Sequence, residues 1–93
     1  MKKIIKIGAE WCGPCKMLEP IFKKISVLEE FKDIEFKSLD ADDNEASDIV
    51  EKFQIRNVPT ILVLNENNEL VNKLIGAVPE SKLLEFCRES LNK

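Results

Sequence analysis

The hydrophobic positions of this chain follow first a strand pattern and then a helical one. Residues 2–7 form a short segment of Ile and Lys that Gly8 ends, which predicts a strand. From Gly13 onward, apolar residues recur at spacings of three and four, as on one face of a helix. These positions are Leu18, Ile21, Phe22, Ile25 and Leu28. Pro20 lies inside this helix, where its missing N–H and its contact with the carbonyl of Lys16 predict a kink.

Strand and helix patterns alternate again in the second half. Residues 34–39 predict a strand, and the acidic segment 40–44 supplies a turn and an N-cap for a shorter helix. The inner face of that helix consists of Ala46, Ile49, Val50 and Phe53. Residues 61–64 are all apolar, as in a strand covered on both faces. The Asn-rich segment 65–69 predicts a hairpin turn, because Asn tolerates the left-handed conformation, and residues 70–75 then pair back as the last strand.

The order of these elements predicts the fold class. Gly76 ends the last strand, and Pro79 opens a final helix with Leu83, Leu84, Cys87 and Leu91 on its inner face. The order is therefore β-α-β-α-β-β-α, in which the first crossover implies a parallel pair and the hairpin an antiparallel one. A mixed four-stranded sheet flanked by three helices, with helices on both faces, satisfies this order and defines an α/β protein. Nothing divides residues 1–93, so we expect one domain.

Composition and charge narrow the classes of function. The net charge of -3 leaves no polybasic footprint, so we expect no nucleic-acid or membrane partner. Apolar runs are only a few residues long, and Lys6 interrupts the N-terminal one before it could serve as a signal peptide. We therefore expect a cytoplasmic protein, and a monomer. The absence of His excludes Cys–His catalysis, His acid–base chemistry and Cys/His zinc sites.

Cys12 and Cys15 form a Cys-x-x-Cys pair where the first strand gives way to the first helix. Unpaired N–H groups and the helix dipole favour a thiolate there, and the thiolate is the attacking species in disulfide exchange. Cys15, one turn further on, could attack the resulting mixed disulfide. Gly13 lets the backbone turn and a substrate approach, while Pro14 fits the first helical turn, where its missing N–H costs little.

The alternative for a lone Cys-x-x-Cys pair is half of a zinc or iron–sulfur site. The usual second pair of ligands is absent, and Cys87 alone cannot complete four ligands, so only a metal shared between two chains would remain. We expect no metal. Cys87 lies on the apolar face of the last helix, which favours a small core residue over a third redox centre.

Residues 9–17, Ala-Glu-Trp-Cys-Gly-Pro-Cys-Lys-Met, resemble the active-site segment of the thioredoxin family nearly residue for residue. Residues 55–60, Ile-Arg-Asn-Val-Pro-Thr, resemble the segment that carries the family's cis-proline. Gly76 and Ala77 resemble the glycine-alanine pair after its last strand, and the resemblance extends over residues 3–91. The resemblance implies the thioredoxin fold.

The same resemblance implies a thiol–disulfide oxidoreductase that reduces protein disulfides, with Cys12 as attacking nucleophile and Cys15 as resolving thiol. A separate thioredoxin-reductase-type donor would reduce the Cys12–Cys15 disulfide, because the chain has no dinucleotide-binding glycine pattern and we expect no bound cofactor. A cis peptide before Pro59 would set the backbone that pairs with substrate. The implied docking surface consists of Trp11, Gly13, Pro14, Val58, Pro59, Gly76 and Ala77.

The chain also departs from the family's pattern. The family usually begins with a further strand and helix, so their absence should leave residues 34–39 at a sheet edge. Gly8 replaces a family tryptophan, which loses packing area but no catalytic group. Six residues before the first cysteine, where the family commonly has a buried Asp that helps to take the proton of the resolving thiol, this chain has Lys6. Ser38 aligns with a common family Lys.

Two interpretations of Lys6 remain open from the sequence. The side chain could be solvated, reaching the opened edge or pairing with Asp40 or Glu35. Alternatively, its cation could favour a thiolate and so change the proton handling at Cys15. We hypothesise the second role, in which Lys6 makes the reaction slower or differently dependent on pH.

Two other functions compete with general disulfide reduction. A glutaredoxin-like, glutathione-dependent reductase would need basic or amide groups for the two carboxylates of the tripeptide. The segment from Gly76 to Pro79 lacks the Gly-Gly and acidic cap that glutaredoxins usually present. A redox-inert binding module would use only the groove beside Pro59, and the presence of both cysteines disfavours it.

Overall fold

The secondary structure follows the predicted order. A computed structural model describes residues 1–92. Its elements are β1 (Lys3–Gly8), α1 (Gly13–Ser26), the short 3₁₀ helix η1 (Glu29–Phe31), β2 (Glu35–Asp40), α2 (Asn44–Lys52), β3 (Thr60–Leu64), β4 (Leu70–Ile75) and α3 (Glu80–Leu91). The order β-α-β-α-β-β-α is therefore confirmed, with η1 as an addition that the hydrophobic pattern did not predict. Within residues 1–92, no helix combines the length and the apolar character needed to cross a membrane.

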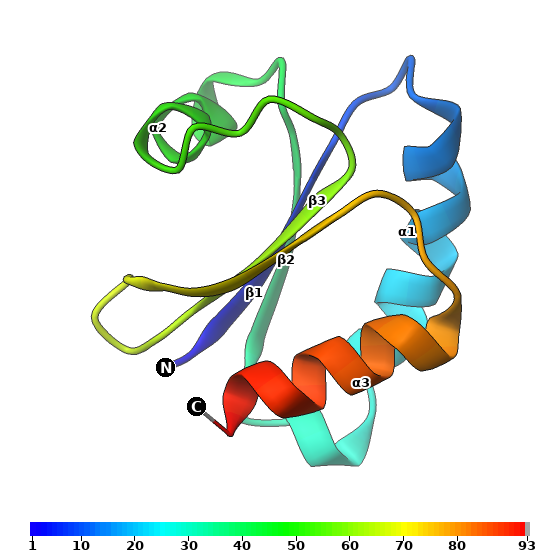
Figure 1. Cartoon of the computed structure of the whole chain (residues 1–93), viewed down its shortest axis with the longest axis vertical. Coiled ribbons are helices and arrows are strands. Elements are labelled where there is room, and N and C mark those ends of the chain that lie inside the picture. The colour runs from blue at the N-terminus through cyan, green and yellow to red at the C-terminus, as the bar shows by residue number, and fades with distance from the viewer. Residues whose placement is uncertain (93) are drawn as a thin grey trace.

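The four strands of the described residues form one mixed sheet in the order β2-β1-β3-β4 (Figure 1). β1 lies parallel to β2, with Lys6 opposite Ser38, and antiparallel to β3, with Lys6 opposite Ile61. β3 and β4 form the antiparallel hairpin. β2 is thus an edge strand, as predicted, while β1 occupies an interior position with a neighbour on each side.

Helices cover both faces of this sheet, which makes a three-layer arrangement (Figure 1). α1 and α3 pack on one face, over a core formed by Ile4, Leu18, Phe22, Ile25, Phe31, Ile61, Val63, Leu83 and Cys87. α2 packs on the other face, over Ile5, Ile7, Leu39, Ala46, Leu62 and Leu64. Because successive side chains of a strand point to opposite faces, Lys6 shares the α1 face with Ile4.

The turn and helix boundaries show where local sequence decides the structure. In the hairpin, Asn65 Oδ1 accepts hydrogen bonds from the backbone N–H groups of Asn67 and Glu69, at 2.9 and 3.0 Å. Asn68 adopts a left-handed φ of 61°, as its residue type allows. α1 runs through Pro20 and ends at Ser26, so the half-buried Leu28 packs on the core from outside the helix. The kink at Pro20 stays a prediction.

Candidate functional site

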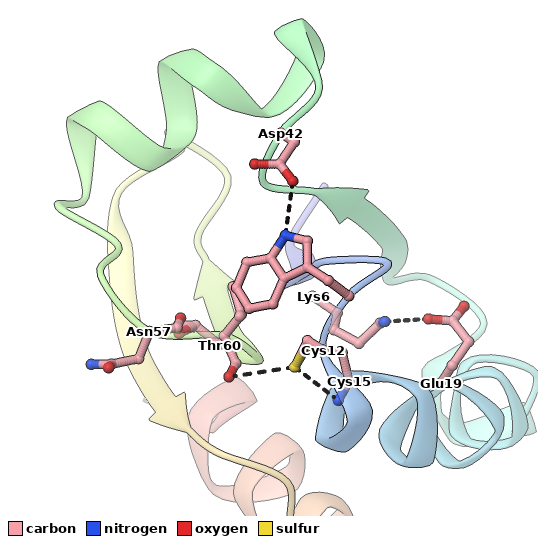
Figure 2. The surroundings of a disulfide bond; sticks show 9 residues. Lys6, Cys12, Cys15, Glu19, Asp42, Asn57 and Thr60 are labelled. Carbon is pink, nitrogen blue, oxygen red and sulfur yellow. Dashed lines mark hydrogen bonds and ion pairs between the residues drawn. A yellow bond between two sulfur atoms is a disulfide. The ribbon is translucent and has the colours of Figure 1, made fainter.

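Cys12 stands at the N-cap of α1, where the chain leaves β1 and turns into the helix. Its backbone is extended, with φ -96° and ψ 110°, and Pro14 occupies the first helical turn. Cys12 Sγ accepts a hydrogen bond from the backbone N–H of Cys15 at 3.2 Å, so the sulfur satisfies one of the unpaired donors of the helix N-terminus (Figure 2). Cys12 and Cys15 are joined by a disulfide, with their Cα atoms 5.3 Å apart. Both are buried, at 6% and 4% exposed.

The segment after α2 brings a second piece of backbone against this disulfide. The Val58 carbonyl oxygen lies 3.8 Å from Cys12 Sγ, and the Val58–Pro59 peptide is cis. Thr60 Oγ1 donates a hydrogen bond to the Asn57 carbonyl at 2.6 Å, which closes the loop around these two residues. The Gly76 N–H donates to the Pro59 carbonyl at 2.8 Å. The structure thus brings Val58, Pro59 and Gly76, predicted from the sequence, together beside Cys12.

Trp11 lies on the exposed side of the disulfide, with 72% of its surface accessible. Its indole N–H donates a hydrogen bond to Asp42 Oδ2 at 3.0 Å, which ties the tryptophan to the turn after β2 (Figure 2). The sequence placed Asp42 only within the turn segment 40–44, so this partner of Trp11 was not predicted. Gly13 and Pro14 are exposed at the start of α1, and Ala77 is exposed after Gly76.

Lys6 is buried and paired with Glu19 of α1, so the solvated interpretation was wrong (Figure 2). The side chain of Lys6 is 5% exposed, and Ser38 Oγ donates a hydrogen bond at 3.1 Å to the same oxygen of Glu19. The expected partners Asp40 and Glu35 were also wrong. In the register of β1 with β2 they stand opposite Gly8 and Lys3, two and three positions away from Lys6.

Glu19 was not singled out from the sequence, although a signal for it existed. Residues four apart lie on the same face of a helix, so Glu19 lies one turn below Cys15 on the same face of α1. Its partial burial alone would raise its pKa. Hydrogen bonding and charge attraction from Lys6, with smaller contributions from Ser38 and Lys23, outweigh burial and hold the pKa of Glu19 below its ordinary value of 4.5.

Gly8 leaves room for Lys6 and Cys15 to approach each other. A Cβ placed on Gly8 would lie 3.4 Å from Cys15 Sγ and 3.5 Å from Lys6 Nζ. Both atoms therefore border the same small space. A cavity of about 370 Å³ adjoins it. Its walls are formed by Lys6, Gly8, Ala9, Glu10, Cys15, Lys16, Glu19, Ser38, Leu39, Asp40 and Asp43.

Cys87 lies far from this chemistry, in the core beneath α3. Its surface is fully buried, and it forms no disulfide. Burial raises the pKa of its thiol to about 12, from an ordinary value of 9.0. Among residues 1–92, no cluster of three or more His, Cys, Asp or Glu side chains is placed to hold a metal ion.

A disulfide at a helix N-terminus, bordered by an exposed tryptophan and the backbone of a second loop, is built for thiol–disulfide exchange. Cys12 Sγ lies where the helix N-terminus favours a thiolate, and Cys15 is one turn away. The fold and the site together define a thiol–disulfide oxidoreductase. The family model named Thioredoxin matches residues 1–89, and the chain belongs to the thioredoxin family.

Individual relatives agree with this assignment. The protein named Thioredoxin Asp f 29 from Aspergillus fumigatus is 37% identical over 76 residues, covering 82% of this chain and 66% of that protein. A thioredoxin from Mycoplasmoides gallisepticum is 33% identical over 87 residues, covering 94% of this chain and 82% of its own length. Among solved structures, the thioredoxin Mala s 13 of Malassezia sympodialis superposes with a TM-score of 0.81 at 31% identity, covering 96% of this chain and 75% of that one.

Proposed function

We propose that this chain reduces disulfide bonds of other proteins by dithiol exchange. The observation that carries the proposal is the position of Cys12 Sγ, which caps α1 and lies beside the Val58 carbonyl. In the reduced protein, the Cys12 thiolate attacks one sulfur of the substrate disulfide, and the other substrate sulfur leaves as a thiolate. Cys15 then attacks Cys12 Sγ in the mixed disulfide, which releases the second substrate sulfur and forms the Cys12–Cys15 bond.

The substrate segment would dock on the surface around the disulfide. In this proposal the Val58 backbone pairs with an extended stretch of substrate, and Trp11, Gly76 and Ala77 contact its side chains. The contact of Val58 with Cys12 Sγ and the hydrogen bond from Gly76 to Pro59 support this arrangement. The shape of this surface would depend also on three residues that do not react, Gly13, Pro14 and Pro59. They would restrict the path by which a substrate disulfide reaches Cys12.

The electron donor, the assembly and the location follow as further proposals. A separate thioredoxin-reductase-type protein would return two electrons to the Cys12–Cys15 disulfide, and no bound cofactor or metal would take part. The chain would act as a single-domain monomer in the cytoplasm. The charge of -3 and the short apolar runs support this environment.

Insulin reduction tests this function. With dithiothreitol as electron source, the protein is expected to accelerate the precipitation of insulin chains, which is followed as turbidity. Cys12→Ser should abolish the acceleration, because the attacking thiolate is lost. Cys15→Ser should also abolish turnover. When reduced and then mixed with insulin in the absence of dithiothreitol, it should accumulate a covalent mixed disulfide, visible by mass spectrometry.

Three outcomes would change the proposal. No acceleration over dithiothreitol alone would overturn the reductase proposal. Acceleration supported by glutathione but not by a thioredoxin-reductase-type donor would identify the glutaredoxin-like alternative instead. A reduction potential of the Cys12–Cys15 pair near that of an oxidant would reverse the proposed direction of electron flow.

A further inference from the structure

Cys15 is buried, yet it is close to a buried cation and to solvent. Its sulfur and the Lys6 ammonium border the same space beside Gly8. A Cβ placed on Gly8 would lie 3.4 Å from Cys15 Sγ and 3.5 Å from Lys6 Nζ. Both residues also line the cavity of about 370 Å³ at this side of the molecule. A cavity of this volume, open to solvent, has room for several water molecules, each of which needs about 30 Å³.

Lys6 is the one buried charge among the groups that line this cavity. The others come from α1, from the loop before it and from the segment around the end of β2. Glu10, Lys16 and Asp43 are exposed, while Glu19 and Asp40 are half-buried. Exposed charges are strongly screened by water, so the buried ammonium and its direct partner dominate the potential at Cys15.

Glu19 fixes the position of that ammonium. It forms an ion pair with Lys6 Nζ and accepts the hydrogen bond from Ser38 Oγ at 3.1 Å on the same oxygen. The ion pair therefore joins β1 to α1 at the level just below Cys15, and Ser38 anchors the carboxylate from β2. Glu19 also offsets part of the positive charge that Cys15 would otherwise meet.

We propose that the Lys6–Glu19 ion pair controls the ionisation of Cys15, the ammonium stabilising the Cys15 thiolate and the carboxylate limiting that stabilisation. In the second step of exchange, the Cys15 thiol gives its proton to solvent in the cavity. The thiolate electron pair then forms the bond to Cys12 Sγ, and the substrate sulfur leaves with the pair of the broken bond and takes a proton from solvent. Glu19 is a positioning residue that acts through Lys6. This inference rests on the proposed function.

The two steps can be observed separately with the aromatic disulfide dithiobis(nitrobenzoate). Attack by Cys12 on the reagent releases one coloured thionitrobenzoate at a rate proportional to reagent concentration. Attack by Cys15 on the resulting mixed disulfide releases a second one at a rate independent of that concentration. The pH dependence of the second phase therefore reports the ionisation of Cys15, and the first phase serves as an internal reference.

Substitutions on the two sides of the ion pair are expected to shift the second phase in opposite directions. Lys6→Met should raise its pH midpoint by on the order of one unit, because the cation is lost. Glu19→Gln should lower the midpoint, because the cation is no longer offset. Lys6→Arg keeps the charge and should stay close to the wild-type midpoint. Lys24→Met and Glu80→Gln are matched controls on an exposed ion pair with N and O atoms 3.0 Å apart, and neither should move it.

The outcomes separate this inference from the proposed function. Absence of the first phase in the wild type would overturn the function itself. A normal first phase, with Lys6→Met and Glu19→Gln shifting the second phase in the same direction or not at all, would overturn only the role of the ion pair. If circular dichroism shows that Lys6→Met does not fold, Glu19→Gln and Lys6→Arg decide the question. The pH midpoint of the second phase should then be lower in Glu19→Gln than in Lys6→Arg, and an equal or higher midpoint would overturn the role of the ion pair.

Discussion

At the scale of single residues, two buried cysteines meet different surroundings. Cys15 borders the space beside the Lys6 ammonium and lines a cavity that is open to solvent, whereas Cys87 is enclosed by the apolar core between α3 and the sheet. Ionising Cys87 would place a charge in that core, which is why burial raises the pKa of its thiol to about 12. Equal burial therefore does not mean equal reactivity, because the charges and the solvent beside the sulfur decide it.

We expect Cys87 to be inert and structural. In the folded protein its labelling by a small thiol reagent near neutral pH should proceed only as fast as the core opens. Cys87→Ala should cost about 1 kcal/mol of unfolding free energy, and Cys87→Ser about 1–3 kcal/mol, because it buries a hydroxyl in apolar surroundings. Urea unfolding measures both variants. Rapid labelling of native protein would contradict this assignment.

At the scale of elements, the packing of α1 on β1 and β2 determines the surroundings of the site. Lys6, Glu19 and Ser38 come from three different elements and meet on one face of the sheet. The pairing of β1 with β2 puts Ser38 opposite Lys6, and the helix places Glu19 over both. Asp42, beyond the end of β2, accepts the hydrogen bond from the indole N–H of Trp11.

This packing predicts how stability depends on pH. The pKa of Glu19 is lowered in the folded state, so its contribution is complete above pH 4.5 and is lost as the pH falls below that value. Once Glu19 is protonated, the buried ammonium of Lys6 is left without its counter-charge. Glu19→Gln should therefore cost about 1–3 kcal/mol at neutral pH and should flatten the decline in unfolding free energy under acid conditions.

Chemical denaturation at a series of pH values provides the measurement. Glu30→Gln is the matched control, because the pKa of Glu30 is also lowered, by its hydrogen bonds with Arg88, but this pair is exposed. Exposed pairs are screened by solvent, so the effect of Glu30→Gln should be smaller. An equal acid dependence in wild type and Glu19→Gln would show that the buried pair does not contribute.

At the scale of the whole molecule, the sheet separates two cores. Ile4 on β1 packs toward α1 and α3, and Ile7 on the same strand packs toward α2. Every residue of β3 is buried, because helices cover both of its faces. The site follows the end of β1. Val58 packs both against the cluster of Ala9, Cys12 and Cys15 and against the core under α2, so that core helps to hold Val58 beside Cys12.

Substitutions in the two separate cores should have additive effects on the free energy of unfolding. Ile4→Val and Ile7→Val each remove one methyl group from a different core and should each cost about 0.5–1.5 kcal/mol. The double variant should equal the sum of the two within about 0.5 kcal/mol, because the side chains point to opposite faces and share no cluster. Urea denaturation of the three variants measures this. A coupling well above that margin would mean that the two layers respond as one.

The edge position of β2 was expected only from the resemblance to the thioredoxin family. From its own residues, the sequence determined the order of the elements, the place of Cys12 and Cys15 at the start of α1 and the hairpin over residues 65–69. These features depend on periodicity, turn chemistry and chain direction, which are local properties. Only the tertiary structure decided the partner of Lys6. A strand side chain in the interior of a sheet meets whatever the covering helix presents, and this depends on the packing of α1 over β1. The tertiary structure also brought Asp42 to Trp11 and left the space at Gly8 that both Lys6 and Cys15 border.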